Sequence, residues 1–239
     1  YKRQVFGFPI QWIPKNPRWQ NYVDIWTQIP LLTFVKNTVK ITVVVTLLQL
    51  FTSSFAAYAF AKMQFKGKNA LFLGYIATIA VPWQAYMVPQ FMMMSSWHLN
   101  NTHLAIMCPQ AFSAFGVFLM KQFSEGIPTE MLEAARIDGA SEARTFVKIV
   151  LPMVKPGIGA LAIFTFINSW NDYFMQLIML SSTSNLTISL GIAKLQAENS
   201  TDFGLIMAGA ALAAVPIIII FLIFQKYFTK GIAMGAVKG

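Results

Sequence analysis

Residues Glu133–Pro152 read EAARIDGASEARTFVKIVLP and carry six charged side chains in twenty positions. Charged residues make up only 11% of the 239-residue chain, and the sequence on both sides of this stretch is largely apolar. A polar insert of this kind is either a solvated loop or a surface built to bind another protein. Its position relative to the apolar stretches separates these two interpretations.

The composition is that of a membrane protein. Hydrophobic residues make up 56% of the chain and the mean hydropathy is +0.56, whereas ordinary soluble domains are about 25% charged. The net charge of +9 does not indicate nucleic-acid binding, because basic residues of membrane proteins gather in cytoplasmic loops. The single cysteine, Cys108, forms no internal disulfide. We expect one all-α integral membrane domain over residues 1–239.

Five apolar stretches are long enough to span a bilayer, which takes about 20 residues in a helix. They lie near residues 31–60, 70–95, 103–123, 149–180 and 204–228. Helices are expected throughout, because the backbone must satisfy its own hydrogen bonds in lipid and no barrel-like alternation is present. Pro82 and Pro89 should bend or interrupt the second stretch.

The basic residues predict the orientation. Eleven of the eighteen lysines and arginines lie after the first, third and fifth stretches, which places those connections in the cytoplasm. Residues 1–30 then form an external loop, residues 124–152 a cytoplasmic loop and residues 229–239 a cytoplasmic tail. Because the chain starts outside and without Met, we expect a sixth span before residue 1 in the natural protein.

Within the cytoplasmic loop the sequence predicts two short helices. Pro128 suits a first helical turn, and Gly139 suits the end of that helix. Ser141 is a good N-cap for a second helix leading to the next span. The predicted unit is a helix, a glycine turn and a helix at the membrane surface.

The spacing of this unit resembles the EAA loop of ABC-importer permeases. The matching residues are Glu133, Ala134, Ala135, Gly139, Ile149, Leu151 and Pro152, and we assign Asp138, beside the glycine, to the same ATPase-coupling site. The small alanines allow close approach of another surface, and a glutamate accepts charge-assisted hydrogen bonds. The resemblance implies a type I ABC-importer transmembrane domain whose first loop helix docks on a cytoplasmic ATPase subunit. The permease itself is then no enzyme: it holds no cofactor, and ATP and Mg²⁺ are bound by the two ATPase subunits. Accordingly the sequence contains no GxxxxGK[ST] phosphate loop.

The C-terminal sequence KGIAMGAVKG resembles that of the smaller, maltose-type permease subunit of carbohydrate-uptake importers. The resemblance implies that the tail reaches the interface between the two ATPase subunits. The tail residues concerned are Gly235, Ala236, Val237, Lys238 and Gly239. The alternative is a frayed terminus.

Polar residues at membrane depth point to a translocation path, because burying them in lipid is costly. Asn168, Trp170, Asn171 and Asp172 cluster in the fourth stretch. An aromatic ring beside amide and carboxylate groups suits a sugar, and hydrogen bonding between helices explains the cluster equally well. His98 and His103 have no nearby cysteine, and we expect no metal site.

We therefore expect a multi-pass permease subunit of the bacterial inner membrane, driven by ATP and importing a sugar or oligosaccharide. Its implied partners are a second, larger permease subunit, two ATPase subunits, an extracytoplasmic sugar-binding protein and the lipid bilayer, with no nucleic acid. The external segment 181–202 would face the binding protein, and its apolar middle would insert into a partner or lie against the bundle. The alternatives are a permease for glycerol phosphate or a polyamine, and an ion-coupled secondary carrier.

Overall fold

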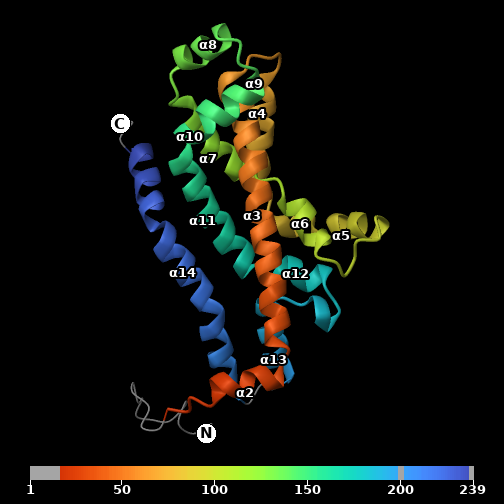
Figure 1. Cartoon of the computed structure of the whole chain (residues 1–239). Helices are drawn as coiled ribbons and strands as arrows, with labels where there is room; N and C mark the ends of the chain where they lie inside the picture. The colour runs from red at the N-terminus through yellow and green to blue at the C-terminus, as the bar shows by residue number, and fades with distance from the viewer. Residues whose placement is uncertain (1–16, 199–201, 237–239) are drawn as a thin grey trace.

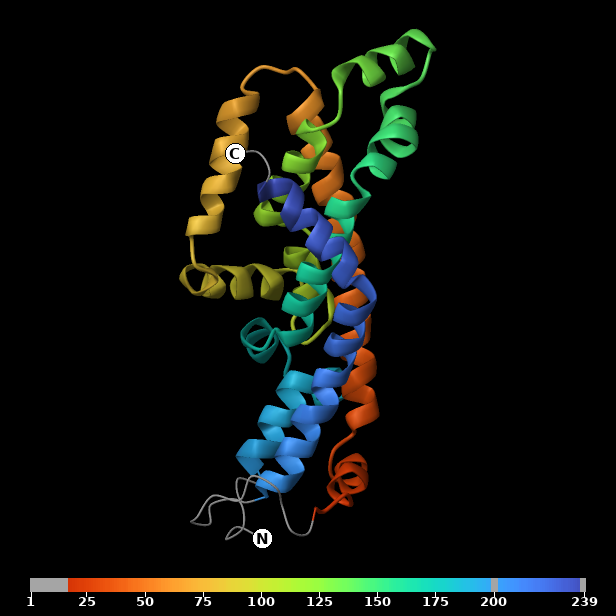
Figure 2. The ribbon, with the colours of Figure 1, turned by 90° about the vertical axis from the view of Figure 1, so that its left-hand side faces the viewer.

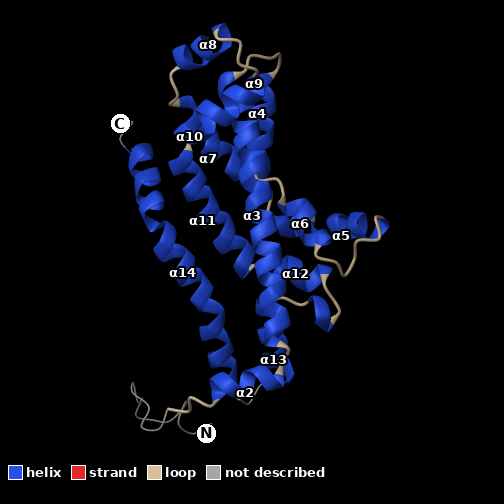
Figure 3. Ribbon diagram, in the orientation of Figure 1, coloured by secondary structure: helices blue, strands red, loops and turns tan. Residues whose placement is uncertain are grey.

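The computed structural model describes residues 17–198 and 202–236, and within these residues the secondary structure is helical without strands (Figure 3). The longest helices are α3 (Leu31–Lys62) and α14 (Phe203–Ala236). With about 1.5 Å of rise per residue, the 32 residues of α3 extend about 48 Å. Helix α3 packs against α7 (Ala114–Glu125) and α11 (Lys155–Asn171), and α11 packs in turn against α14 (Figure 1).

Three helical segments of the described residues are long and apolar enough to cross a membrane: Leu31–Lys62, Leu104–Glu125 and Phe203–Gln225. They correspond to the first, third and fifth predicted spans. The second of these segments combines α6 (Leu104–Gln110) with α7. For the fourth predicted span, the helical segment Glu142–Met153 meets Lys155–Asn171 at an angle of 79°. The helix that follows this bend, α11, carries the crossing part of predicted span 149–180.

The second stretch, residues 70–95, is interrupted as its prolines predict, and no single helix covers it. This stretch is divided into α4 (Lys68–Ala77), the 3₁₀ turns η1 (Thr78–Ala80) and η2 (Trp83–Ala85), and α5 (Met87–Ser96). The break lies at Val81, whose backbone is extended because the following residue, Pro82, disfavours the helical conformation. Helix α4 runs along the bundle, and α5 crosses its direction (Figure 2). The expected interruption is thus at Pro82. Pro89 lies in the first turn of α5, where a proline does not break the helix.

The buried apolar side chains form two clusters along the bundle. One contains Phe34, Ile41 and Trp170 and lies toward the end of the bundle that carries α2 (Asn21–Gln28). The other contains Tyr58, Leu132 and several partners at the opposite end. Between these clusters α3 carries Gln49, which lines the cavity described below.

The segment that follows α11 packs against the bundle. It contains α12 (Phe174–Met179), η4 (Thr183–Asn185) and α13 (Ile188–Glu198). Ile188 is buried and its backbone N–H donates to Thr38 Oγ1 of α3 at 2.9 Å. Asn37, one position earlier in α3, donates to the carbonyls of Ser184 and Leu186 at 2.8 Å each. Of the two alternatives for this apolar segment, the structure favours packing on the bundle.

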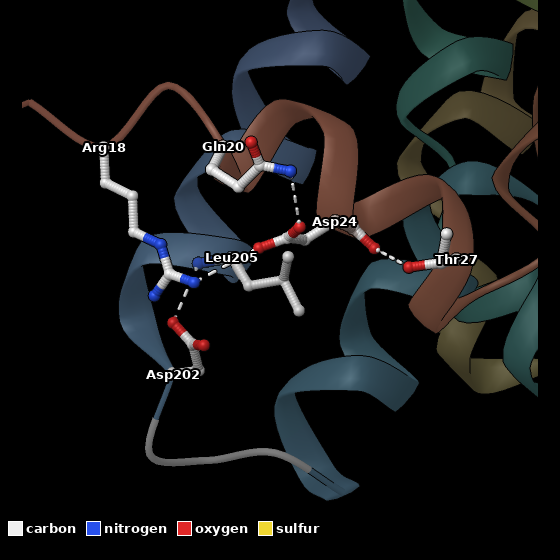
Figure 4. A network of polar contacts seen from close by, with 6 residues as sticks. All are labelled: Arg18, Gln20, Asp24, Thr27, Asp202 and Leu205. Carbon is white, nitrogen blue, oxygen red and sulfur yellow. Dashed lines mark hydrogen bonds and ion pairs between the residues drawn. The ribbon is translucent and has the colours of Figure 1, made fainter.

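Helix α2 contacts α14 and lies at the end of the bundle where α13 also lies (Figure 1). Asp24 accepts hydrogen bonds from Arg18 at 3.3 Å and from Gln20 at 3.0 Å, and Arg18 points toward Asp202 (Figure 4). Asp202 in turn accepts from the backbone N–H of Leu205 at 3.1 Å, at the start of α14. These polar contacts fix the position of α2 beside the beginning of the last helix.

Candidate functional site

The polar insert folds as the sequence predicts, into a helix, a turn and a helix. Helix α8 covers Thr129–Ile137, directly after Pro128, and α9 covers Glu142–Thr145. Gly139 has φ +75°, the left-handed conformation in which a glycine is least strained. The Ser141 hydroxyl accepts from the Arg144 backbone N–H at 3.3 Å and so caps α9. Both local signals of the sequence, the glycine turn and the serine cap, are confirmed.

Helix α8 has one packed side and one open side. Leu132 and Ala135 are buried against the bundle, three residues apart on one face. Met131 is 44% exposed and Ile137 is 86% exposed, with exposed Ala134 between them. The two alanines of the motif therefore differ: Ala135 allows α8 to pack closely on its own chain, and Ala134 belongs to a small open apolar surface.

The other motif residues surround this open surface or lead away from it. Glu133, Asp138 and Gly139 are exposed on the same helix and turn, whereas Ile149 and Leu151 are half-buried and Pro152 is exposed. Residues Phe146–Val150 form a π-helical turn between α9 and α10 (Leu151–Met153). The second half of the motif therefore forms the connection to α11.

A cavity of about 330 Å³ lies in the middle of the bundle, between α3, η2, α6, α11 and α12. Polar and aromatic groups from these elements face one volume. We call this volume the central cavity, and its lining residues are Val45, Gln49, Trp83, Gln110, Ser113, Phe164, Thr165, Asn168, Ser169, Asp172, Phe174 and Met175.

A chain of hydrogen bonds crosses the central cavity. Thr165 of α11 donates to Gln49 Oε1 at 2.9 Å, and Gln49 Nε2 donates to the Gln110 carbonyl at 2.8 Å. The Gln110 side-chain amide then donates to Asp172 Oδ2 at 2.7 Å. Helices α3, α6 and α11, which are distant in sequence, are connected by these bonds, and polar groups are held at a depth where the flanking sequence is apolar.

Other polar groups of the cavity remain available. The Asn168 side chain is exposed to the cavity volume, and the buried Ser169 hydroxyl has no hydrogen-bond partner within the described residues. Trp83 is oriented by a bond of 2.7 Å from its indole N–H to Gln90 Oε1. An aromatic face, an amide, a hydroxyl and a carboxylate therefore border one space.

The four residues of the predicted path separate into two groups. Asn168 and Asp172 line the central cavity. Trp170 is 2% exposed, and its indole N–H donates to the Ala213 carbonyl of α14 at 3.0 Å, so it packs between α11 and α14. Asn171 is exposed and donates to the Ile167 carbonyl of its own helix at 3.0 Å. Neither Trp170 nor Asn171 is among the lining residues.

Sequence reasoning named two of the twelve lining residues and missed ten, among them the hydrogen-bonded Gln49, Gln110 and Thr165. A signal was present for Gln49 and Gln110, since each is an amide inside a stretch predicted to span the membrane. Of the predicted tail residues, Gly235 and Ala236 end the helix α14, so that part of the tail is helical. Val237, Lys238 and Gly239 lie outside the described residues.

Comparison with known proteins identifies the family. The model of the binding-protein-dependent transport system inner membrane component matches residues 21–234. The chain belongs to this family. A permease of this family is a multi-pass membrane protein, and membership sets aside the ion-coupled carrier considered from the sequence.

Curated relatives of this permease are similar over most of their length. The arabinooligosaccharides transport system permease protein AraQ of Halalkalibacterium halodurans is 36% identical over 234 residues, covering 98% of this chain and 84% of that protein. The lactose transport system permease protein LacG of Rhizobium radiobacter is 35% identical over 218 residues, covering 91% and 80%.

A solved structure supports the fold of the permease. A chain of a bacterial ABC transporter involved in the import of the acidic polysaccharide alginate matches with a TM-score of 0.81. It is 23% identical and the match covers 90% of this chain and 81% of that chain. The predicted fold, an ABC-importer transmembrane domain, is confirmed.

Proposed function

We propose that this chain is the permease subunit of an ATP-driven, binding-protein-dependent importer and forms part of the path for an uncharged sugar or oligosaccharide. The relatives named for arabino-oligosaccharide and lactose transport support this class of substrate. The observation that carries the proposal is the central cavity, in which Trp83, Asn168 and Asp172 border one space. An aromatic ring stacks on the apolar face of a sugar, while an amide donates to and accepts from its hydroxyls and a carboxylate accepts from them.

The charge of the cavity favours an uncharged solute over glycerol phosphate. Asp172 is acidic, and the described lining contains no lysine or arginine. A phosphate in the cavity would meet the carboxyl group of Asp172, and the described lining offers no cationic side chain to pair with it.

We also propose that α8 couples this path to two ATPase subunits, which bind ATP and Mg²⁺ and do the hydrolysis. The open surface of α8, formed by Met131, Ala134 and Ile137, is small and apolar, as a surface that docks in a cleft of another subunit should be. A second, larger permease subunit would complete the path, and an extracytoplasmic binding protein would deliver the sugar. The C-terminal residues 235–239 would contact the ATPase pair.

The experiment is uptake by the importer complex, isolated through a tag on this chain and reconstituted in vesicles with its binding protein. Labelled neutral oligosaccharides are offered, with glycerol phosphate and putrescine as unlabelled competitors. Competition by neutral sugars alone supports the proposal. Competition by putrescine would instead identify a polyamine importer, and competition by glycerol phosphate would refute the electrostatic argument.

Two asparagines of α11 provide a matched pair for the cavity. Asn168→Ala removes an amide that lines the cavity, and Asn171→Ala removes an exposed amide three positions away that does not. We expect the first to raise the KM for uptake about fivefold or more, the value of about one hydrogen bond, and the second to leave it unchanged. Equal effects of the two substitutions would contradict the assignment of the path.

A further inference from the structure

One carboxylate joins the polar helix pair to the longest central helix. Glu142, at the start of α9, accepts from the Tyr58 hydroxyl of α3 at 2.5 Å through Oε2. Its other oxygen, Oε1, accepts from Arg136 Nε in the last turn of α8 at 2.8 Å. Side chains of α3, α8 and α9 therefore meet at a single group.

The Tyr58 side of this junction is tightly packed, whereas the side chains of the Arg136–Glu142 ion pair are 41% and 42% exposed. Tyr58 is 2% exposed, and its ring lies 5.5 Å from that of Phe146, which also packs edge-on against Phe55 at 5.8 Å. Hydrogen bonds from Arg136 and then from Tyr58 hold the pKa of the Glu142 carboxyl below its usual range. The carboxyl is therefore ionised at neutral pH, and both bonds to it are charge-assisted.

A second attachment lies one helical turn further along α3. Lys62 Nζ donates to the Ile127 carbonyl at 2.6 Å and to the Glu125 carbonyl at 3.2 Å. These carbonyls lie just before α8 begins at Thr129. Helix α3 thus holds the chain on both sides of α8, through Lys62 before it and Tyr58 after it.

The route along the chain from α9 to α11 is less direct. It passes through the π-helical turn Phe146–Val150 and then through the 79° bend before Lys155. Irregular turns and bends of this kind absorb displacement, whereas a straight helix transmits it. The side-chain contacts to α3 are therefore the stiffer connection between α8 and the bundle.

We propose that Tyr58 and Glu142, together with Arg136, are positioning residues that make α8 and α3 move as one body. Helix α3 is then the span that receives the motion of the ATPase subunits. This inference rests on the proposed function. It reaches the substrate as well, because Gln49, the centre of the hydrogen bonds in the central cavity, lies on α3 about 14 Å from Tyr58 along the helix axis.

The test uses the whole importer complex in vesicles, with uptake and ATP hydrolysis measured on the same preparation. Tyr58→Phe keeps the packed ring and removes the hydroxyl, and Glu142→Gln keeps the shape and removes the charge. We expect the sugar transported per ATP to fall about tenfold in both variants, a typical size for a lost coupling between sites. The double variant Arg136→Glu with Glu142→Arg keeps an ion pair of reversed polarity. Its sugar transported per ATP should lie between the value for Glu142→Gln and that for the parent.

The matched control is Lys66→Gln. Lys66 is an exposed charged residue just after α3 at the same end of the bundle, and within the described residues its side chain forms no hydrogen bond or ion pair with another element. Sugar transported per ATP should therefore remain unchanged in this variant. An equal loss of coupling in Lys66→Gln would overturn the inference, since the loss of any charge at this end would then suffice.

Spin labels give a readout that a merely structural role would not move. Cysteines replace Thr129, which is exposed at the start of α8 and outside its docking surface, and exposed Leu47 on α3, with Cys108→Ser removing the native thiol. The distance between the labels should stay the same with and without ATP in the parent protein, and should change in the Tyr58→Phe protein. A change on ATP binding in the parent would overturn the inference.

The two levels of the proposal fail in different ways. If the parent complex hydrolyses ATP and moves no sugar, the proposed function is refuted. If the parent couples hydrolysis to uptake and Tyr58→Phe keeps its transport per ATP, the function stands and the role of Tyr58 and Glu142 is refuted.

Discussion

The turn at Gly139 allows the role of the helix pair to be tested with a small and defined perturbation. Gly139 has φ +75°, and a Cβ added there would meet no heavy atom within 4 Å. Gly139→Ala therefore introduces no clash. Its cost is that of a left-handed backbone for an L-residue, about 1–2 kcal/mol. This energy changes the equilibrium constant between the native turn and its alternatives by a factor of about 5–30.

The expected result is partial uncoupling. The turn sets the direction of α8 relative to α9, so a weakened turn lets the docking surface leave its position while the bundle remains folded. ATPase subunits should co-purify with this chain in lower yield, and uptake should fall by at most the same roughly 5–30-fold factor. Uptake by the Gly139→Asn variant should lie between that of the parent and that of Gly139→Ala, because asparagine tolerates the left-handed conformation better than alanine does.

Gly67 provides the control for this prediction. It has φ +79°, also with no heavy atom within 4 Å of an added Cβ, and it precedes α4 at the same end of the bundle. Gly67→Ala should cost the same stability in thermal unfolding and leave uptake unaffected. The reasoning is refuted if Gly67→Ala lowers uptake as much as Gly139→Ala, or if Gly139→Ala retains full uptake and ATPase binding.

Two further predictions concern the opposite end of the bundle. Gly191→Ala should destabilise the protein by about 1–3 kcal/mol in thermal unfolding, because its Cβ would overlap the buried ring of Phe34, whereas Gly74→Ala meets nothing within 4 Å and should not destabilise. His103 lies just before the span that begins at Leu104, and burial lowers the pKa of its ring. The neutral ring therefore stabilises the folded protein fully above about pH 6.5, and this contribution to the free energy of unfolding is lost as the pH falls through the lowered pKa. The unfolding temperature of the parent should therefore decrease on acidification below pH 6.5, and a decrease of the same size in His103→Gln would contradict this assignment.

The helix pair was predictable because its determinants are local. A glycine turn and a serine cap act within three or four residues, and the structure has both where the sequence indicates them. The break of the second span was predictable in kind, since two prolines lie in it. Only Pro82 interrupts the helix, because Pro89 falls in a first turn, where the missing N–H has no partner to lose.

The predicted path was less successful because four polar neighbours were treated as one patch. Successive residues of a helix turn by about 100°, so residues four apart share a face and adjacent residues do not. Asn168 and Asp172 share the face toward the central cavity, while Trp170 and Asn171 point elsewhere. Helical spacing therefore separates Trp170, which lies about 200° from Asn168, but not Asn171, which is three positions from Asn168 and is placed outside the cavity lining only by the structure.

The remaining part of the site depends on contacts between distant segments. Gln49 meets a carbonyl 61 positions later and a hydroxyl 116 positions later, and no local rule relates these residues. The same holds for Tyr58, which meets Glu142 84 positions away. Gln49 and Tyr58 are nine residues apart, which turns a helix by about 900° and places them on opposite sides of α3. A search for one polar face would therefore never pair them, and their connection is the rigid helix itself: motion applied at Tyr58 reaches Gln49 because α3 has no break between them.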